Sequence, residues 1–129
     1  MIGRGREWFL PKIKGGARPD GRNLISEMGA RGYRYLEQPA EMENINPKNA
    51  RKVLALFPGR YEPEAVVEKA IAILSRNPRG YFLMFEWDCH QKSTQDSLEN
   101  TLRLDRTAER VRKATDAQKT LLLITADHS

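Results

Sequence analysis

The 129-residue sequence has few of the features that mark exported or membrane-spanning chains. Its longest uninterrupted apolar runs, among them residues 81–85, are five residues long, whereas a helix that crosses a bilayer needs about 20. No apolar stretch of about 7 to 15 residues follows Met1, which argues against a secretory signal. The single cysteine, Cys89, cannot form an internal disulfide. We therefore expect a water-soluble domain, or part of one, that has no membrane partner.

The excess of positive charge is small and lies near the N-terminus. Residues 1–40 contain eight Lys and Arg against four Asp and Glu, while residues 41–129 contain fourteen against thirteen. A solvated basic face explains this pattern best, because charge alone indicates solubility and nonspecific attraction. Nucleic-acid binding is a weaker interpretation, since Trp8, Phe9, Tyr33 and Tyr35 fit core and strand packing better than base stacking.

The first half of the chain alternates between helical and β-type segments. Gly and Pro residues mark the loops between them. Pro63 suits the first turn of a helix whose apolar residues follow helical spacing and which stops before Asn77. In chain order, the sequence predicts a helix at 23–31, a strand at 33–36 ended by Pro39, a helical turn beginning at Asn46, a buried strand at 53–57 and the helix that begins at Pro63.

Three elements in the second half predict a βαβ unit. Residues 81–85 are apolar without alternation, which is typical of a strand buried on both faces of a parallel sheet. Residues 120–124 form a second run of this kind. Between them, a helix of about five turns has Asp96 or Ser97 as its expected N-cap. This helix places Leu98, Leu102, Ala108 and Val111, together with Asp105, on nearly one face, its predicted apolar face.

Acidic and histidine side chains follow both predicted strands. Glu86, Asp88 and His90 come after the first, and Asp127 and His128 come after the second. Because a crossover helix makes the two strands parallel, their carboxyl ends share the edge at which open α/β sheets bind ligands. Three carboxylates and two imidazoles placed there would repel one another or be poorly solvated unless bound protons or cations compensated them. These donors suit Zn²⁺ and Mg²⁺, so the cluster favours a metal site over separate structural roles such as capping.

Other polar residues in this region are predicted to be structural. In an extended segment Cys89 and Trp87 point away from the predicted ligands, so we expect them to pack. Asp96 and Ser97 at a helix start could suggest a nucleophile, but Asp and Ser are common caps and no base is placed to activate the hydroxyl. We interpret this pair as a cap.

Three segments carry a family resemblance. They are residues 77–86 with the sequence NPRGYFLMFE, the pair Leu104 and Asp105, and residues 120–129 with the sequence TLLLITADHS. Weaker similarity lies upstream in residues 3–6, 9–11, 20–25 and 32–33. In this order, the segments resemble the alkaline phosphatase family over nearly the whole chain.

The resemblance implies specific metal ligands. Glu86 corresponds to the magnesium ligand of the family, Asp88 and His90 to ligands of one zinc ion, and Asp127 and His128 to ligands of the second. The segment from Glu86 to His90 is shorter than in the best-known members. The implied cofactors are Zn²⁺ and Mg²⁺.

The resemblance also implies an activity and an incomplete domain. Family members hydrolyse phosphate monoesters through a phosphoserine intermediate. Their Asp-Ser nucleophile motif and phosphate-binding arginine lie upstream of anything that matches Met1, and a further histidine ligand lies downstream of Ser129. We therefore expect residues 1–129 to be a single partial α/β domain, incomplete at both ends and inactive alone. Its mostly parallel sheet would carry helices on both faces, as part of an α/β/α sandwich.

Location, assembly and stability follow from the same expectation. The family resemblance implies a periplasmic or extracellular protein, and a homodimer is a possible assembly. Sheet edges without neighbouring strands predict marginal stability, with aggregation or dependence on a partner.

Two alternatives remain open at this point. The first is a noncatalytic module that uses the same cluster to bind metal or phosphate, with the basic N-terminal segment recruiting phosphate or nucleic acid. The second is a purely structural fragment or subunit, which would take up no zinc.

Overall fold

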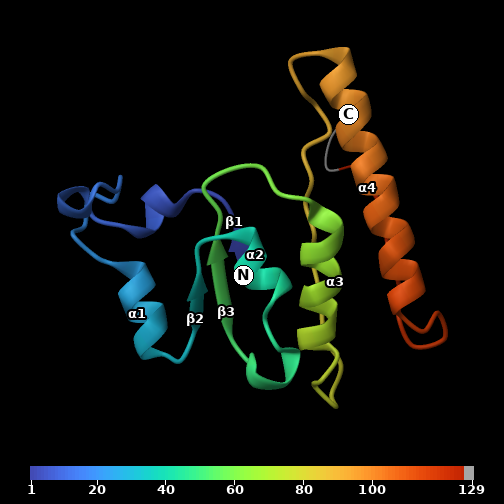
Figure 1. The fold of residues 1–129 in the computed structure, drawn as a ribbon, viewed down its shortest axis with the longest axis horizontal. Helices are drawn as coiled ribbons and strands as arrows, with labels where there is room; N and C mark the ends of the chain where they lie inside the picture. Colours follow the sequence, from blue (N-terminus) through green and yellow to red (C-terminus); the bar gives the residue numbers. More distant parts are fainter. Residues whose placement is uncertain (127–129) are drawn as a thin grey trace.

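A small parallel β-sheet organises the chain. The structure is a computed structural model that describes residues 1–126. Its strands are β1 (Ile2–Gly3), β2 (Arg34–Leu36) and β3 (Val53–Leu56), in the order β1-β3-β2 (Figure 1). Both outer strands run parallel to β3, with Ile2 opposite Ala55 and Tyr35 opposite Leu54. All four β3 residues are buried, as the apolar run at 53–57 predicts.

Within residues 1–126 the structure has four α-helices and three 3₁₀ turns. The predicted helices are confirmed as α1 (Leu24–Ala30), capped by the Asn23 side chain, and α3 (Pro63–Leu74). The predicted helical turn is also found, at Pro47–Asn49. Missed by sequence reasoning were β1, the turns Arg6–Phe9 and Lys12–Lys14, and α2 (Pro39–Glu43), in which Pro39 begins a helix as well as ending the strand.

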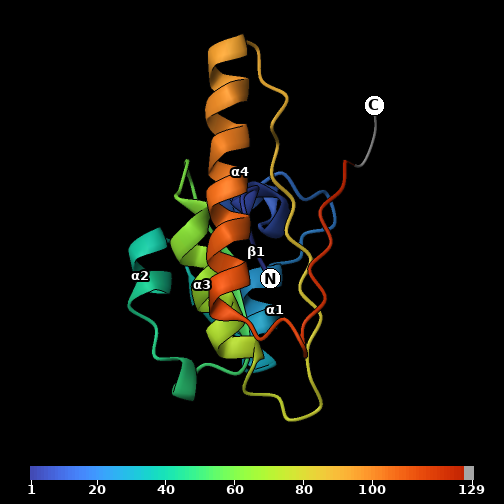
Figure 2. The same cartoon turned by 90° about the vertical axis from the view of Figure 1, so that its right-hand side faces the viewer.

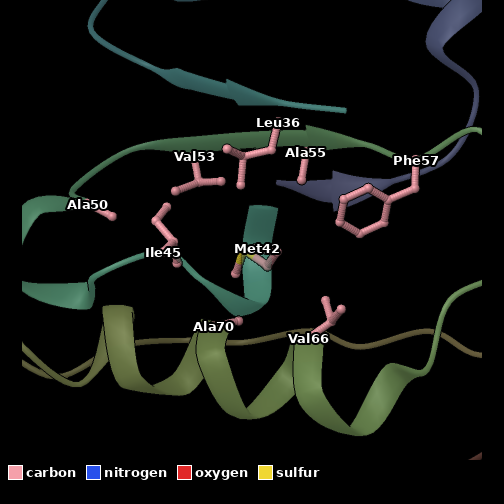
Figure 3. Packing of buried hydrophobic residues seen from close by; sticks show 9 residues of the cluster. All are labelled: Leu36, Met42, Ile45, Ala50, Val53, Ala55, Phe57, Val66 and Ala70. Atoms are coloured by element: carbon pink, nitrogen blue, oxygen red, sulfur yellow. The ribbon is translucent and has the colours of Figure 1, made fainter. Parts of the chain in front are cut away.

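The core lies between the sheet and α3. Met42 of α2 is fully buried between them, beside Val66 and Ala70 of α3 (Figure 3). Leu36, Val53, Ala55 and Phe57 close the core from the sheet side, and Ile45 and Ala50 from the connecting segment. The α/β class with a parallel sheet is therefore confirmed, with the core on the face that carries α2 and α3.

The longest helix, α4 (Thr94–Ala114), packs against α3. Thr107 is buried in this contact, and three Arg–Glu pairs accompany it. The predicted apolar face of the helix is only partly covered: Leu98 and Leu102 are 59% and 47% exposed, whereas Ala108 and Val111 are partly buried. No helix among residues 1–126 is long and apolar enough to cross a membrane.

The predicted βαβ unit is not formed. Residues 81–85 and 120–124 have no strand structure, and no backbone hydrogen bond joins either segment to the sheet among the described residues. Figure 2 draws both segments as extended traces, the first in yellow and the second in red. Phe82 is 85% exposed and Leu121 is 82% exposed. The prediction of two buried strands was wrong because apolar runs adopt strand structure only beside a partner strand.

The predicted N-cap of α4 was also wrong. The cap is Ser93, whose hydroxyl accepts a hydrogen bond from the Asp96 N–H at 3.0 Å. Ser97 lies within the first turns, where its hydroxyl accepts from the Gln91 N–H at 3.0 Å. Its role is structural, as expected, but the position of the cap differs by several residues.

Candidate functional site

A cavity of about 810 Å³ opens beside β1. It lies between β1, α3, the segment that follows residue 82 and the N-terminal half of α4. Apolar side chains contribute much of its lining, among them Ile2, Val66, Val67, Ala70, Leu83 and Phe85. The size is within the range of about 300 to 1,000 Å³ that is typical of ligand sites.

Exposed and partly buried side chains alternate along the segment after residue 82. Glu86, Asp88 and His90 are exposed, whereas Trp87 and Cys89 are partly buried. This alternation in exposure agrees with the predicted packing of Trp87 and Cys89 along an extended segment. Glu86 and Asp88 also border the cavity, so two of the five predicted ligands lie beside it.

Asp88 anchors this segment to α4. Its carbonyl oxygen accepts hydrogen bonds from the Asn100 side chain at 2.9 Å and from the Gln91 side chain at 3.1 Å. Its carboxylate accepts from the His90 backbone N–H at 3.0 Å. The sharp turn after the segment is therefore held by local hydrogen bonds.

The five predicted metal ligands are not all described. Asp127 and His128 lie outside the described residues. Among residues 1–126 no three His, Cys, Asp or Glu side chains are close enough together to hold a metal ion. The chemistry of Glu86, Asp88 and His90 suits magnesium and zinc, but these three do not form such a cluster by themselves.

Aromatic rings form one wall of the cavity. The Tyr61 ring contacts Phe57 and Trp87 edge to face, with centroid distances of 5.1 and 5.8 Å. Phe85 stacks on Trp87 at 6.0 Å. Burial raises the pKa of the Tyr61 hydroxyl, and the positive charge of Arg4 opposes that rise. The Trp87 Nε1 atom is buried and has no hydrogen-bond partner among the described residues.

Cationic side chains outnumber acidic ones around the cavity. Arg4, Arg51, Lys52, Arg60 and Arg103 line it, against Glu86 and Asp88. Sequence reasoning did not single out these cationic residues. The signal for Arg4 was its place directly after β1, which is only two residues long and carries almost no sequence pattern.

The fold defines an α/β protein, and the cavity beside β1 has the size of a ligand site. Comparisons with known proteins identify its family. A sequence model of the alkaline phosphatase family matches residues 1–129. The chain therefore belongs to the alkaline phosphatase family, as the resemblance of its motifs indicates.

Individual relatives carry the same family name. The chain is 28% identical to an alkaline phosphatase of Gadus morhua, over 100% of this chain and 34% of the relative. It is 32% identical to a membrane-bound alkaline phosphatase of Bombyx mori, over 100% of this chain and 29% of the relative. It is 28% identical to the human tissue-nonspecific isozyme of alkaline phosphatase, over 100% of this chain and 31% of the relative. The chain thus spans about a third of the length of the curated relatives it matches.

Proposed function

We propose that this chain is part of a metal-dependent phosphoric monoester hydrolase. The observation that carries the proposal is the match to the alkaline phosphatase family across residues 1–129. The substrate would be a phosphate monoester. A periplasmic or extracellular location and a homodimer belong to the same proposal and rest on family membership alone.

The proposed contribution of the chain is a set of metal ligands. Glu86 would bind magnesium, Asp88 and His90 one zinc ion, and Asp127 and His128 a second. Support comes from their donor chemistry and from the placement of Glu86, Asp88 and His90 on the exposed side of one segment. When bound, such ions supply charge neutralisation at a phosphate and activation of a nucleophile.

No residue of the chain is assigned as the nucleophile. Ser97, which follows an aspartate, is held by the Gln91 main chain, and no histidine or carboxylate makes a hydrogen bond to its hydroxyl among the described residues. We therefore propose that these 129 residues alone do not hydrolyse phosphate monoesters.

Zinc binding and turnover, measured on the same samples, test this proposal. The purified chain is compared with a His90→Ala/His128→Ala double variant for zinc content, zinc affinity and hydrolysis of p-nitrophenyl phosphate. We expect zinc in the parent chain, little zinc in the double variant and turnover in neither. Glu99→Gln, a change on the exposed surface of α4, serves as the control and should retain zinc.

Two results would contradict separate parts of the proposal. Equal zinc content in the parent and double variant, or no zinc in either, would show that His90 and His128 do not bind zinc in this chain. Turnover by the parent chain that persists after repurification would show that these residues include a nucleophile.

The noncatalytic alternative has one specific observation in its favour. The cavity beside the sheet is lined by more cationic than acidic side chains, which suits an anion such as phosphate. Phosphate binding without turnover or zinc uptake would support this alternative over the hydrolase.

A further inference from the structure

Two arginines stand at the carboxyl edge of the sheet. Arg4 directly follows β1, and Arg60 follows β3 after the turn at Pro58 and Gly59. Both line the cavity. Ligands of open α/β sheets bind outside the carboxyl ends of the strands, so these two side chains occupy the favoured place for a binding group.

Neither arginine has an acidic partner among the described residues. Nearby Arg6 pairs with Glu37 at 3.1 Å, and Arg103 pairs with Glu62 at 3.4 Å. By contrast, Arg4 and Arg60 make no ion pair with a carboxylate within residues 1–126. Burial raises the pKa of the Tyr61 hydroxyl, and the positive charge of Arg4 opposes this rise, so Arg4 interacts electrostatically with Tyr61. The two guanidinium groups are therefore available to an anion at the aromatic wall.

The aromatic wall includes a buried indole N–H group. Trp87 lines the cavity, and its Nε1 donor is buried and has no acceptor within residues 1–126. Tyr61 packs edge to face on Trp87, so the wall also offers flat apolar surface.

We propose that this end of the cavity binds an organic anion that carries a planar apolar body. Arg4 and Arg60 bind the anionic group through charge-assisted hydrogen bonds, and Tyr61 and Trp87 contact the planar body. The proposal involves none of the residues proposed as metal ligands. It therefore stands or falls independently of zinc binding and of hydrolysis.

The two tryptophans of the chain provide the measurement. Each indole N–H gives its own signal in ¹H–¹⁵N NMR spectra, and Trp8→Phe assigns them. Titrations in EDTA, which keeps metal out of the result, use 2-naphthoate, the neutral analogue 2-naphthalenemethanol and inorganic phosphate. We expect 2-naphthoate to shift the Trp87 signal saturably and to leave the Trp8 signal in place, since Trp8 is absent from the cavity lining.

Variants separate the roles of charge and shape. Arg4→Gln/Arg60→Gln should weaken 2-naphthoate binding by at least about tenfold, because two charge-assisted contacts are lost. Arg4→Lys/Arg60→Lys should keep part of the affinity. Arg79→Gln, which removes one exposed guanidinium outside the cavity, should leave it unchanged. The NMR spectrum of each variant shows directly whether it has folded.

Several outcomes would overturn the proposal. Equal binding of 2-naphthalenemethanol would mean an apolar crevice without anion recognition. Saturable binding of inorganic phosphate at the same affinity would mean that the aromatic wall contributes nothing. Unchanged affinity in the double Gln variant, or a Trp87 signal that never moves, would remove Arg4, Arg60 and Trp87 from any such site.

Discussion

At the scale of single residues, Met42 joins the sheet to α3. It is 0% exposed and is the buried residue of α2, a helix of only five residues. The Met42 side chain therefore makes the contribution of this helix to the core between the sheet and α3. Met42→Ala should lower the free energy of unfolding by about 2 to 5 kcal/mol, because it removes buried surface and leaves a cavity. Urea denaturation followed by circular dichroism measures the change.

The chain supplies a matched control for that substitution. Met84 is 77% exposed, and Met84→Ala should change the free energy of unfolding by no more than about 0.5 kcal/mol. Similar losses in both variants would show that Met42 is not the core residue that its burial indicates.

Glu41 provides a pH-dependent contribution at the start of α2. Its Oε2 atom accepts hydrogen bonds from the backbone N–H groups of Glu37 at 2.7 Å and Gln38 at 2.8 Å. These bonds hold the pKa of the carboxyl below its usual value. The folded state therefore favours the charged form, and the resulting stability is present above the unfolded pKa of about 4.3 and is lost as the pH falls through the lower folded pKa.

Glu41→Gln tests this linkage. The parent chain should exceed the variant in urea midpoint at pH 7, and its advantage should shrink at pH 3. Glu43→Gln, a matched change on the same helix, controls for loss of a negative charge. An advantage for the parent that stays constant between pH 7 and pH 3 would show that Glu41 does not titrate in this way.

At the scale of elements, ion pairs accompany the packing of α4 on α3. Arg106 Nε lies 3.1 Å from Glu64 Oε1, and Arg110 lies 3.1 Å from Glu68. The first pair differs from the second because the Glu64 side chain is 11% exposed, whereas that of Glu68 is 51% exposed. Removing the partner of a buried carboxylate costs more than breaking an exposed pair.

This difference predicts unequal effects of two similar substitutions. Arg106→Gln should lower the free energy of unfolding by about 1 to 3 kcal/mol, because Glu64 keeps a buried charge without its partner. Arg110→Gln should cost no more than about 1 kcal/mol. Adding Glu64→Gln to Arg106→Gln should recover part of the loss, as measured by urea denaturation. Equal losses in the two single variants would mean that burial of Glu64 does not matter.

Elements with a local sequence signal are the ones that can be predicted from the sequence. α1, β3 and α3 carry local signals, namely the Asn23 cap, an apolar run between polar residues, and Pro63 before helically spaced apolar residues. The segments 81–85 and 120–124 carry equally strong apolar signals but remain unpaired. Helices are formed by contacts along the chain, whereas a strand needs a neighbour, and sequence pattern cannot supply that neighbour.

The candidate site likewise has features that local sequence predicts and features that depend on the pairing of strands. The alternation of Glu86, Asp88 and His90 with Trp87 and Cys89 is a local property of an extended segment, and the structure confirms it. A meeting of these donors with Asp127 and His128 depends on the pairing of two strands, so it stays a prediction. Arg4 was missed because the two-residue strand before it has too little pattern to be recognised.

At the scale of the whole molecule, the unpaired segments leave apolar surface open to water. Phe82 and Met84 are 85% and 77% exposed, and Leu121 and Leu123 are 82% and 76% exposed. Parallel sheets normally have both faces covered, and large exposed apolar patches mark surfaces that associate. Among the described residues, no strand pairs with either segment.

We expect the parent chain to self-associate with increasing concentration for this reason. Phe82→Lys/Leu121→Lys places one charge on each unpaired segment and should shift the population toward monomer in light scattering, because a charge opposes burial of these segments between copies. Ile13→Lys is the control, since Ile13 is 92% exposed and belongs to the Lys12–Lys14 turn rather than to either segment. If Ile13→Lys has the same effect as the double variant, net charge rather than the unpaired segments governs association. If only the double variant is monomeric and its helical circular dichroism is unchanged, the two segments form the associating surface while the sheet, α3 and α4 fold without it.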